Sequence, residues 1–259
     1  MEKLIIVKEE NVAYITLNRP KVYNSFDREM ALALQSALKD CSDDPKIRAA
    51  VIRGTGKAFC AGQDLKEAID PDNGLDLGTI IKEHYNPIVR QIRAMQMPVI
   101  AAVNGIAAGA GANLALACDF VIASQNASFL QAFTHIGLIP DTGGTYFLPR
   151  LVGLAKATEL MMLGEKVPAE EAQRIGMIYK AVPQEEFESA YKALAVRLAK
   201  MPTKGLALSK KLLQLSSQNQ LPEQLEQELA LQIEAGATDD YQEGVNAFLE
   251  KRKPIFKGH

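Results

Sequence analysis

Two glycine-containing segments have the composition of loops that bring backbone N–H groups to a reacting oxygen. KAFCAGQD at 57–64 and GIAAGAGANLALACDF at 105–120 each follow a short apolar run, and each leads into a predicted helix. The first turn of a helix exposes unpaired N–H groups with partial positive charge, and small side chains let an anionic atom reach them. Two such loops together would form an oxyanion hole for an enolate or a tetrahedral intermediate. Tight packing of the second helix in the core is the alternative explanation.

Three other glycine motifs do not fit these segments. A dinucleotide-binding fingerprint would need a third glycine at the position of Leu114. GTGKAF at 54–59 contains the Gly-Lys pair of a phosphate-binding loop, but Ala58 follows it and the distal glycine is missing. The G-x-S-x-G nucleophile elbow is absent from the sequence. The glycines therefore do not indicate a nucleotide-binding loop or a serine hydrolase.

Three aspartates are candidates for acid–base chemistry. Asp64 directly follows the first glycine loop, and Asp141 lies in LIPDTGGTY just before a predicted helix. An N-cap role is the alternative for Asp141. Asp119 ends the second glycine-rich helix, and we interpret it as a pairing or capping residue. Cys60 lies in the first loop, but no partner histidine is indicated, so we interpret it as a small buried residue rather than a nucleophile.

The elements that must position these residues alternate between strands and helices. KLIIVKE and VAYITLN flank a two-residue turn and predict a hairpin. A helix capped by Ser25 or Asp27 follows, and RAAVIRG, PVIAAV and FVIAS predict further strands. The helical pattern at 79–95 contains Pro87, which predicts a kink, and 71–78 has the composition of a surface loop. This rhythm favours parallel strands up to about residue 150, whereas the last third is mostly helical.

The bulk composition excludes several classes of protein. The chain has 259 residues and a formal net charge of −2, so there is no basic excess that would favour nucleic acid. No apolar run reaches the roughly 18–20 residues that span a bilayer, so we expect no membrane segment. The three cysteines have no C-x-x-C spacing, which argues against a disulfide framework or a zinc site. We expect a cytoplasmic protein with no metal.

Several segments together resemble the crotonase, or enoyl-CoA hydratase/isomerase, superfamily. They are LNRPKVYNSF, AFCAGQDL, AVNGIAAGAGANLALACD, HIGLIPDTGGTYFLPRLVG and EGVNAFLEKRKPIFKG, in that order along nearly the whole chain. The resemblance implies an α/β fold: a spiral of ββα units over residues 1–200 that carries the thioester site, and a helical trimerisation region over 201–259. It also implies a coenzyme A thioester as substrate, no separate cofactor, and a homotrimer or a dimer of trimers.

The resemblance also assigns roles to individual residues. The two oxyanion-hole N–H groups carry over to Ala61 and Ala110. Asp141 falls where isomerases of ring-1,2-epoxyphenylacetyl-CoA place their acid–base aspartate. The residues that the resemblance and the two loops place against the substrate are Lys21, Val22, Gly62, Gln63, Asp64, Leu65, Gly109, Asn113, Phe133 and Leu138.

The strongest departure from the hydratases concerns the two glutamates that share a water molecule in those enzymes. Their positions are held here by Asn113 and Phe133, neither of which transfers a proton as a carboxylate does. We therefore predict an acyl-CoA isomerase with a single aspartate, converting ring-1,2-epoxyphenylacetyl-CoA to its oxepin isomer. The alternatives are a Δ3,Δ2-enoyl-CoA isomerase, a hydratase-like enzyme, a dehalogenase with Asp141 as nucleophile, and a non-catalytic RNA-binding protein of the same fold.

Overall fold

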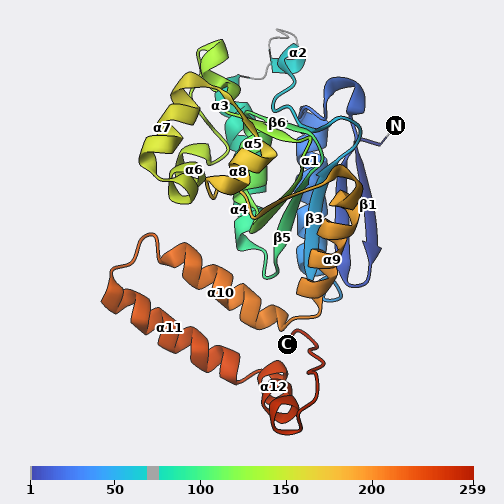
Figure 1. Cartoon of the computed structure of the whole chain (residues 1–259), viewed down its shortest axis with the longest axis vertical. Helices are drawn as coiled ribbons and strands as arrows, with labels where there is room; N and C mark the ends of the chain where they lie inside the picture. The colour runs from blue at the N-terminus through green and yellow to red at the C-terminus, as the bar shows by residue number, and fades with distance from the viewer. Residues whose placement is uncertain (1, 69–75) are drawn as a thin grey trace.

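The computed structural model describes residues 2–68 and 76–259, which form two sheets and the helices around them (Figure 1). The surface loop expected at 71–78 lies largely outside the described residues. The larger sheet has six strands in the order β1 (Leu4–Glu9), β2 (Val12–Leu17), β3 (Ala49–Gly54), β5 (Val99–Val103), β7 (Phe120–Ser124) and β10 (Lys180–Val182). The smaller sheet has four strands in the order β4 (Ala58–Cys60), β6 (Ile106–Ala108), β8 (Ser128–Leu130) and β9 (Lys166–Pro168).

Successive strands alternate between the two sheets, which produces the spiral. β3, β5 and β7 lie in the larger sheet, and each is followed within a few residues by β4, β6 or β8 of the smaller sheet. The pairs β2–β3, β3–β5, β5–β7 and β7–β10 are parallel, as are β4–β6 and β6–β8. The predicted ββα spiral with parallel strands is confirmed. Because β4 and β6 are parallel neighbours, the loops that follow them leave the same edge of the smaller sheet.

The helices fall into three groups along the chain. Those of the spiral are α1 (Arg28–Asp43), α2 (Leu65–Ala68), α3 (Leu77–Thr79), η3 (Ile80–Tyr85), α4 (Asn86–Ala94), α5 (Ala110–Ala117) and the short η1 (Pro20–Val22) and η4 (Ala132–Ile136). Those that follow are α6 (Gly144–Val152), α7 (Leu154–Leu163), α8 (Ala169–Arg174), η5 (Gln184–Glu186) and α9 (Phe187–Ala199). The last three are α10 (Thr203–Leu215), α11 (Leu221–Gly236) and α12 (Asp239–Leu249).

The β1–β2 turn and the start of α1 have clear local causes. Glu10 and Asn11 both have positive φ, at 49° and 62°, which is the conformation of a type I′ turn and closes the predicted hairpin β1–β2. Asp27, not Ser25, caps α1, because its carboxylate accepts the N–H of Met30 at 2.9 Å. The sequence left these two capping residues open, and the hydrogen bond decides between them.

The predicted kink near Pro87 takes the form of a change of helix type. Ile80–Tyr85 is a π-helical turn, and α4 begins at Asn86 with Pro87 in its first turn. Proline has no N–H to donate and is tolerated in the first turn of an α-helix, so the irregular turn precedes it. This places Tyr85 at the junction, where its side chain is buried.

Apolar residues on both faces of the larger sheet build two cores. α9 packs on one face with Phe187, Tyr191 and Ala195 against Val51 and Ile100. The other face and the smaller sheet pack against α1, α4 and α5, which are joined in one continuous cluster. α5 is buried along its whole length, so its small residues serve packing as well as any chemistry at its N-terminus.

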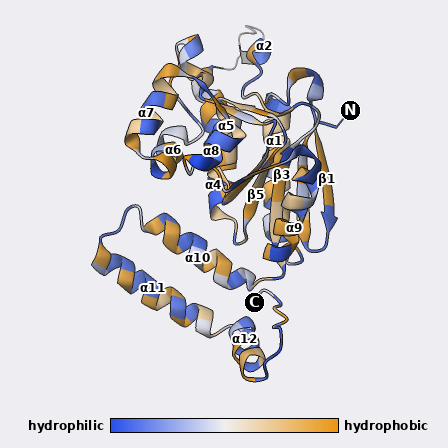
Figure 2. Cartoon of the chain, viewed as in Figure 1, coloured by the Kyte–Doolittle hydropathy of each residue, from blue (hydrophilic) through white to orange (hydrophobic). Residues whose placement is uncertain are grey.

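Helices α10–α12 lie below the spiral in Figure 1, as an orange to red layer apart from the sheets. α11 carries apolar residues at intervals of four, Leu221, Leu225, Leu229 and Ile233, whose side chains the rest of the chain leaves exposed. Figure 2 shows hydrophobic (orange) segments along this helix. The boundary at 200/201 stays a prediction. Across the described ranges, every helix is too short or too polar to cross a membrane.

Candidate active site

The two glycine loops meet at the N-terminus of α5, as predicted. Gly62 follows β4 with φ +91°, and a Cβ built on it would lie 3.0 Å from the carbonyl oxygen of Ala108 and 3.4 Å from the nitrogen of Ala110. Gly109 is the N-cap of α5 with φ 52° and ψ −126°. Glycine is required at both positions, because a side chain would be strained in that backbone conformation and would crowd the neighbouring loop at Gly62. The first residue of α5 thus lies directly beside the first loop.

The other glycine of this helix has a packing role. A Cβ at Gly111 would lie 2.2 Å from the carbonyl oxygen of Cys60, far inside any tolerable contact. The absent side chain lets α5 approach β4 closely. Both explanations for the small residues therefore hold, at different positions: Gly111 allows close packing, and Gly109 shapes the turn that frees the amide of Ala110.

The backbone hydrogen bonds show which amides are free. The N–H of Ala61 donates to the carbonyl of Tyr23 at 3.0 Å, so the prediction that Ala61 supplies an oxyanion-hole donor is wrong. Within residues 2–68 and 76–259, the N–H groups of Gln63 and Ala110 donate to no other residue. Ala110 is free because it opens a helix. Gln63 is free because the first loop makes its bonds to the segment before α1 through Gly62 and Asp64, on either side of it.

Asp141 lies in the turn between η4 and α6 and is tied directly to α5. Its backbone carbonyl accepts the side-chain amide of Asn113 at 2.8 Å and the N–H of Gly144 at 2.9 Å. Asn113 stands three residues after Ala110, one turn along α5, so the carboxyl-bearing turn and the free amide belong to the same site. Burial raises the pKa of the Asp141 carboxyl group, and a hydrogen bond from Thr142 works in the opposite direction.

Both polar atoms of the Asn113 side chain make structural hydrogen bonds. Its Nδ2 donates to Asp141, and its Oδ1 accepts Nε2 of Gln131 at 2.8 Å. Asn113 and Gln131 are both buried, at 0% and 2% exposure. The expected contact between Asn113 and substrate stays a prediction, since these bonds give the side chain a role in holding the Asp141 turn.

Tyr85 joins the first loop to the same region. Its hydroxyl donates to Oε1 of Gln63 at 2.7 Å. Burial raises its pKa well above the ordinary value, and the charges of Asp141, Glu67 and Asp64 add to that rise. Phe133 of η4 is buried and lies 3.8 Å from the position that a Cβ on Gly109 would take. Apolar rings thus border the helix end where the free amide lies.

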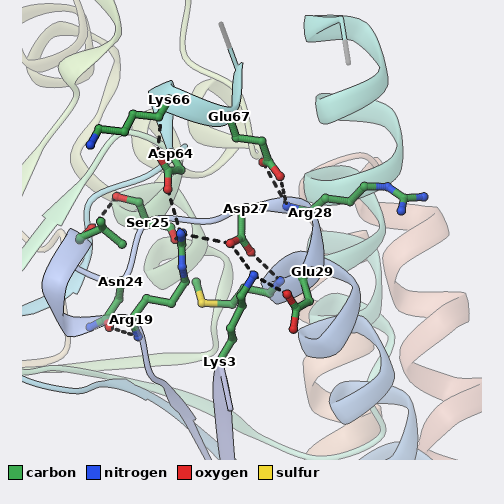
Figure 3. Close-up of polar contacts among 12 residues, drawn as sticks. Lys3, Arg19, Asn24, Ser25, Asp27, Arg28, Glu29, Asp64, Lys66 and Glu67 are labelled. Carbon is green, nitrogen blue, oxygen red and sulfur yellow. Dashed lines mark hydrogen bonds and ion pairs between the residues drawn. The ribbon is translucent and has the colours of Figure 1, made fainter. Parts of the chain in front are cut away.

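Asp64, a candidate acid or base, is instead part of an ion-pair cluster (Figure 3). Nη2 of Arg19 lies 2.9 Å from Oδ2 of Asp64 and 3.1 Å from Oδ2 of Asp27. Lys3 reaches Asp27 from the other side at 2.7 Å, and Oδ1 of Asp64 accepts the N–H of Lys66 in α2. The carboxylate therefore ties the first loop to the segment before α1.

The remaining predicted site residues lie around the two loops. Lys21 and Val22 belong to η1, directly before Tyr23, whose carbonyl holds the first loop. Lys21 and Leu65 are exposed, and Leu138 is half-buried after η4. These positions are compatible with contact to a long ligand, and that contact stays a prediction.

Two residues set aside on sequence grounds have structural roles. Asp119 pairs with Lys210 at 2.8 Å and with Arg93 at 3.2 Å, and it accepts the N–H of Val99, so its interpretation as a pairing residue is confirmed. Cys60 is 0% exposed, and burial raises the pKa of its thiol to about 12. A thiol that stays protonated is a poor nucleophile, as expected for a buried packing residue.

The residues that sequence reasoning missed are Gln63 as a donor, Thr142 and Tyr85. The sequence placed Gln63 against the substrate but did not identify its backbone N–H as a donor. That N–H is free because neighbouring backbone groups, and not its own, make the hydrogen bonds to the segment before α1. Thr142 directly follows the aspartate, yet nothing in TGG indicated that its hydroxyl would turn back to it. The helical pattern at 79–95 places Tyr85 on its apolar face, but nothing in that pattern indicates the hydrogen bond to Gln63.

The spiral of ββα turns is the crotonase fold. An enoyl-CoA hydratase from Bacillus anthracis matches it with a TM-score of 0.92 and 33% identity, covering 100% of both chains. The chain belongs to the enoyl-CoA hydratase/isomerase family, whose model matches residues 7–259. It is an enzyme of that family.

Its relatives include both activities. The chain is 49% identical over 249 residues to a protein named probable enoyl-CoA hydratase of Rhodobacter capsulatus, covering 96% of this chain and 95% of that protein. It is 46% identical over 260 residues to the 1,2-epoxyphenylacetyl-CoA isomerase of Escherichia coli K12, covering 100% and 99%. Overall identity therefore does not separate isomerase from hydratase, and the site residues must carry that distinction.

Proposed function

We propose that this protein is an acyl-CoA isomerase whose substrate is ring-1,2-epoxyphenylacetyl-CoA and whose product is the ring-expanded oxepin thioester. The observation that carries the proposal is the half-buried carboxyl group of Asp141, on the turn that Asn113 anchors one helical turn from the free amide of Ala110. The likeness to the E. coli isomerase supports the choice of substrate.

The amides of Gln63 and Ala110 serve as the oxyanion hole in this proposal. Both donate to no described residue, and both border the contact between Gly62 and α5. Two N–H groups at the thioester oxygen make the α-carbon more acidic and stabilise the enolate. Losing one such donor typically reduces the rate by about 10²–10³.

Asp141 serves as the single base and acid. The ionised carboxylate takes the proton from the α-carbon, the C–C bond between the two epoxide carbons breaks as the ring expands, and the carboxyl group returns the proton to a ring carbon. Atoms are conserved and no water is added. Such transfers contribute roughly 10²–10⁴ to a rate. A hydratase-type reaction also needs groups that hold the attacking water, and Asn113 is used by Asp141 and Gln131 instead. Asp64 is likewise used by Arg19.

Double-bond migration in an unbranched enoyl thioester is a second candidate. The same oxyanion hole and lone carboxyl group suffice for it. The chain is also 36% identical, over 96% of its length, to the trans-2-decenoyl-[acyl-carrier-protein] isomerase of Streptococcus mutans. This candidate differs from the first in the acyl group and in needing no ring bond to break.

A panel of three thioesters tests the proposal: epoxyphenylacetyl-CoA, a 3-enoyl-CoA and crotonyl-CoA, each followed by mass and ultraviolet spectrum. We expect an unchanged mass and a new absorption band with the epoxide. A mass gain of one water from crotonyl-CoA at a comparable rate would overturn the isomerase assignment. Turnover of the 3-enoyl thioester alone would favour the second candidate.

We also propose that the chain assembles as a trimer through α10–α12. Leu221, Leu225, Leu229 and Ile233 form one stripe of α11, and each is more than half exposed in the single chain. A second copy of the same chain is the expected cover, because four exposed apolar side chains in a row on one helix indicate an association surface. Sedimentation equilibrium gives the assembled mass, and a monomer at micromolar concentration would contradict the proposal.

A further inference from the structure

We propose that Thr142 is a positioning residue for Asp141: its hydroxyl holds Oδ1 of the carboxylate and leaves Oδ2 as the oxygen that exchanges the proton. The inference rests on the proposed role of Asp141 as acid and base. Oγ1 of Thr142 donates to Oδ1 at 2.7 Å, and Thr142 is 2% exposed. The backbone N–H of Asp141 also interacts with its own carboxylate, and no different residue in the described ranges donates a hydrogen bond to Oδ2. The two oxygens of the carboxylate are thus made different before any substrate arrives.

The backbone at Thr142 supports a functional reason for this residue. Its φ is +53°, in the left-handed region that β-branched residues rarely adopt. A glycine would adopt this conformation without strain, and the next residue, Gly143, is a glycine with φ +78°. Strained residues persist where the surrounding structure over-determines them, and they gather at functional sites. The hydroxyl on Asp141 is the feature that threonine supplies here and glycine would not.

The surrounding contacts hold the strained turn in place. The carbonyl of Asp141 receives two donors, the side chain of Asn113 and the N–H of Gly144. Gln131 fixes Asn113 from behind. Gly144 leaves room for this arrangement, because a Cβ there would lie 2.2 Å from Nδ2 of Asn113. The backbone of the turn is therefore bonded to α5, the helix whose first amide is free. Thr142 adds a hydrogen bond at the carboxyl group.

The chemical consequence concerns the ionised form of Asp141. A hydroxyl donor stabilises a carboxylate, so Thr142 opposes the effect of burial, which raises the pKa. Within the described parts of the chain few titratable groups face Asp141: α5 carries none, Tyr85 of η3 lies within range of its charge, and His135 of η4 is exposed with its ring near Gly164. In the reaction Oδ2 takes the proton from carbon and gives it back, and Thr142 keeps its own hydrogen throughout.

The test measures the pKa of Asp141 directly in the resting protein, by infrared titration of its carboxyl band, assigned by difference against Asp141→Asn. Thr142→Val removes the hydroxyl and keeps the size. Thr142→Gly removes the hydroxyl and also relieves the backbone. We expect both to raise the pKa of Asp141 by about one unit and to lower kcat by about tenfold with little change in KM. Thr142→Ser keeps the hydroxyl and should restore the pKa.

Thr158→Val is the matched control, because Thr158 lies exposed on α7 and donates only to Leu154. It should leave the pKa of Asp141 unmoved. An unchanged pKa in both Thr142→Val and Thr142→Gly would overturn the inference even if both variants lose activity, since loss alone would then reflect a disturbed turn. Retained turnover in Asp141→Asn would instead end the proposed function, while the titration would still decide the contact between Thr142 and Asp141.

Discussion

The hydroxyl of Tyr85 donates a hydrogen bond to Oε1 of Gln63 over 2.7 Å, and the backbone amide of Gln63 is one of the two free N–H groups at the site. A side chain from the π-helical turn therefore holds the residue whose main chain is proposed to bind the thioester oxygen. The bond links the irregular helix η3 to the first glycine loop.

Replacing Tyr85 by phenylalanine should remove the hydrogen bond to Gln63 without leaving a cavity in the core. Tyr85 is 3% exposed and packs edge-to-face on Phe26, and phenylalanine keeps this packing. We expect kcat to fall about tenfold, as for one lost hydrogen bond. Steady-state kinetics and the thermal midpoint of unfolding check it. Kinetics equal to those of the unmodified protein would show that the Gln63 amide is positioned without Tyr85.

The activity should depend on pH through Asp141. Burial raises its pKa, and the base must be ionised, so kcat/KM should fall as the pH drops through a value above that of an ordinary aspartate. Asp141→Asn should lower kcat by roughly 10²–10⁴. Since a raised carboxyl pKa destabilises the folded state at neutral pH, this variant should unfold at an equal or higher urea concentration. A marked loss of stability would indicate that the carboxylate is mainly structural.

A methyl group at Gly62 should close the space between the two loops. Gly62→Ala would place a Cβ 3.4 Å from the nitrogen of Ala110, at φ +91°. We expect kcat/KM to fall at least about tenfold, with a loss of stability of about 1–2 kcal/mol from the left-handed backbone. Gly153→Ala is the control, since Gly153 has φ +78° and nothing lies within 4 Å of its Cβ position. Its ψ of 158° lies in a region that only glycine adopts readily, so it should lose at least as much stability, with normal kinetics. Equal kinetic losses in both variants would mean that strain alone is responsible.

The ion pairs around Asp27 should make stability depend on pH. Lys3, the N–H of Met30 and Arg19 outweigh burial and lower the pKa of Asp27. A lowered carboxyl pKa contributes stability above the unfolded value, about 3.9, and that contribution is lost as the pH falls through the folded value. Asp27→Asn keeps a capping side chain but removes the charge, so it should cost about 1 kcal/mol or more at pH 7. Urea titrations from pH 7 to pH 3 should show a difference in the free energy of unfolding that shrinks toward acid; a constant difference would show that the charge of Asp27 is not its source.

Charges on the apolar stripe of α11 should disrupt the proposed trimer. Leu225 and Leu229 are 53% and 57% exposed in the single chain, so Leu225→Glu with Leu229→Glu places the new charges mainly at the exposed face of α11. We expect a monomer of normal helical content, measured by sedimentation and circular dichroism. Lys180→Glu on β10 serves as a charge-changing control, because Lys180 is exposed and lies outside α10–α12. An assembly unaffected by the paired substitutions would place the interface elsewhere.

Much of this protein is determined by local sequence. Apolar runs bounded by turns predict the hairpin and the parallel strands, because alternation and strand–helix rhythm reflect which faces must be buried. The segments at 57–64 and 105–120 indicate the two site loops, since only glycine and alanine leave a helix end accessible. Asp141 and the absence of a carboxyl group at positions 113 and 133 are likewise visible in the sequence.

Only the tertiary structure decided which groups remain free. Ala61 and Gln63 are two residues apart, and one amide is used by Tyr23 while the other has no partner among the described residues. Asp64 and Asp141 are the same residue type, yet Asp64 pairs with Arg19, whereas partial burial raises the pKa of Asp141. Thr142 and Tyr85 reach the site from segments whose patterns show no such role. A hydrogen bond can be claimed by any neighbour that folding brings near, so the availability of a group is a property of the packed chain.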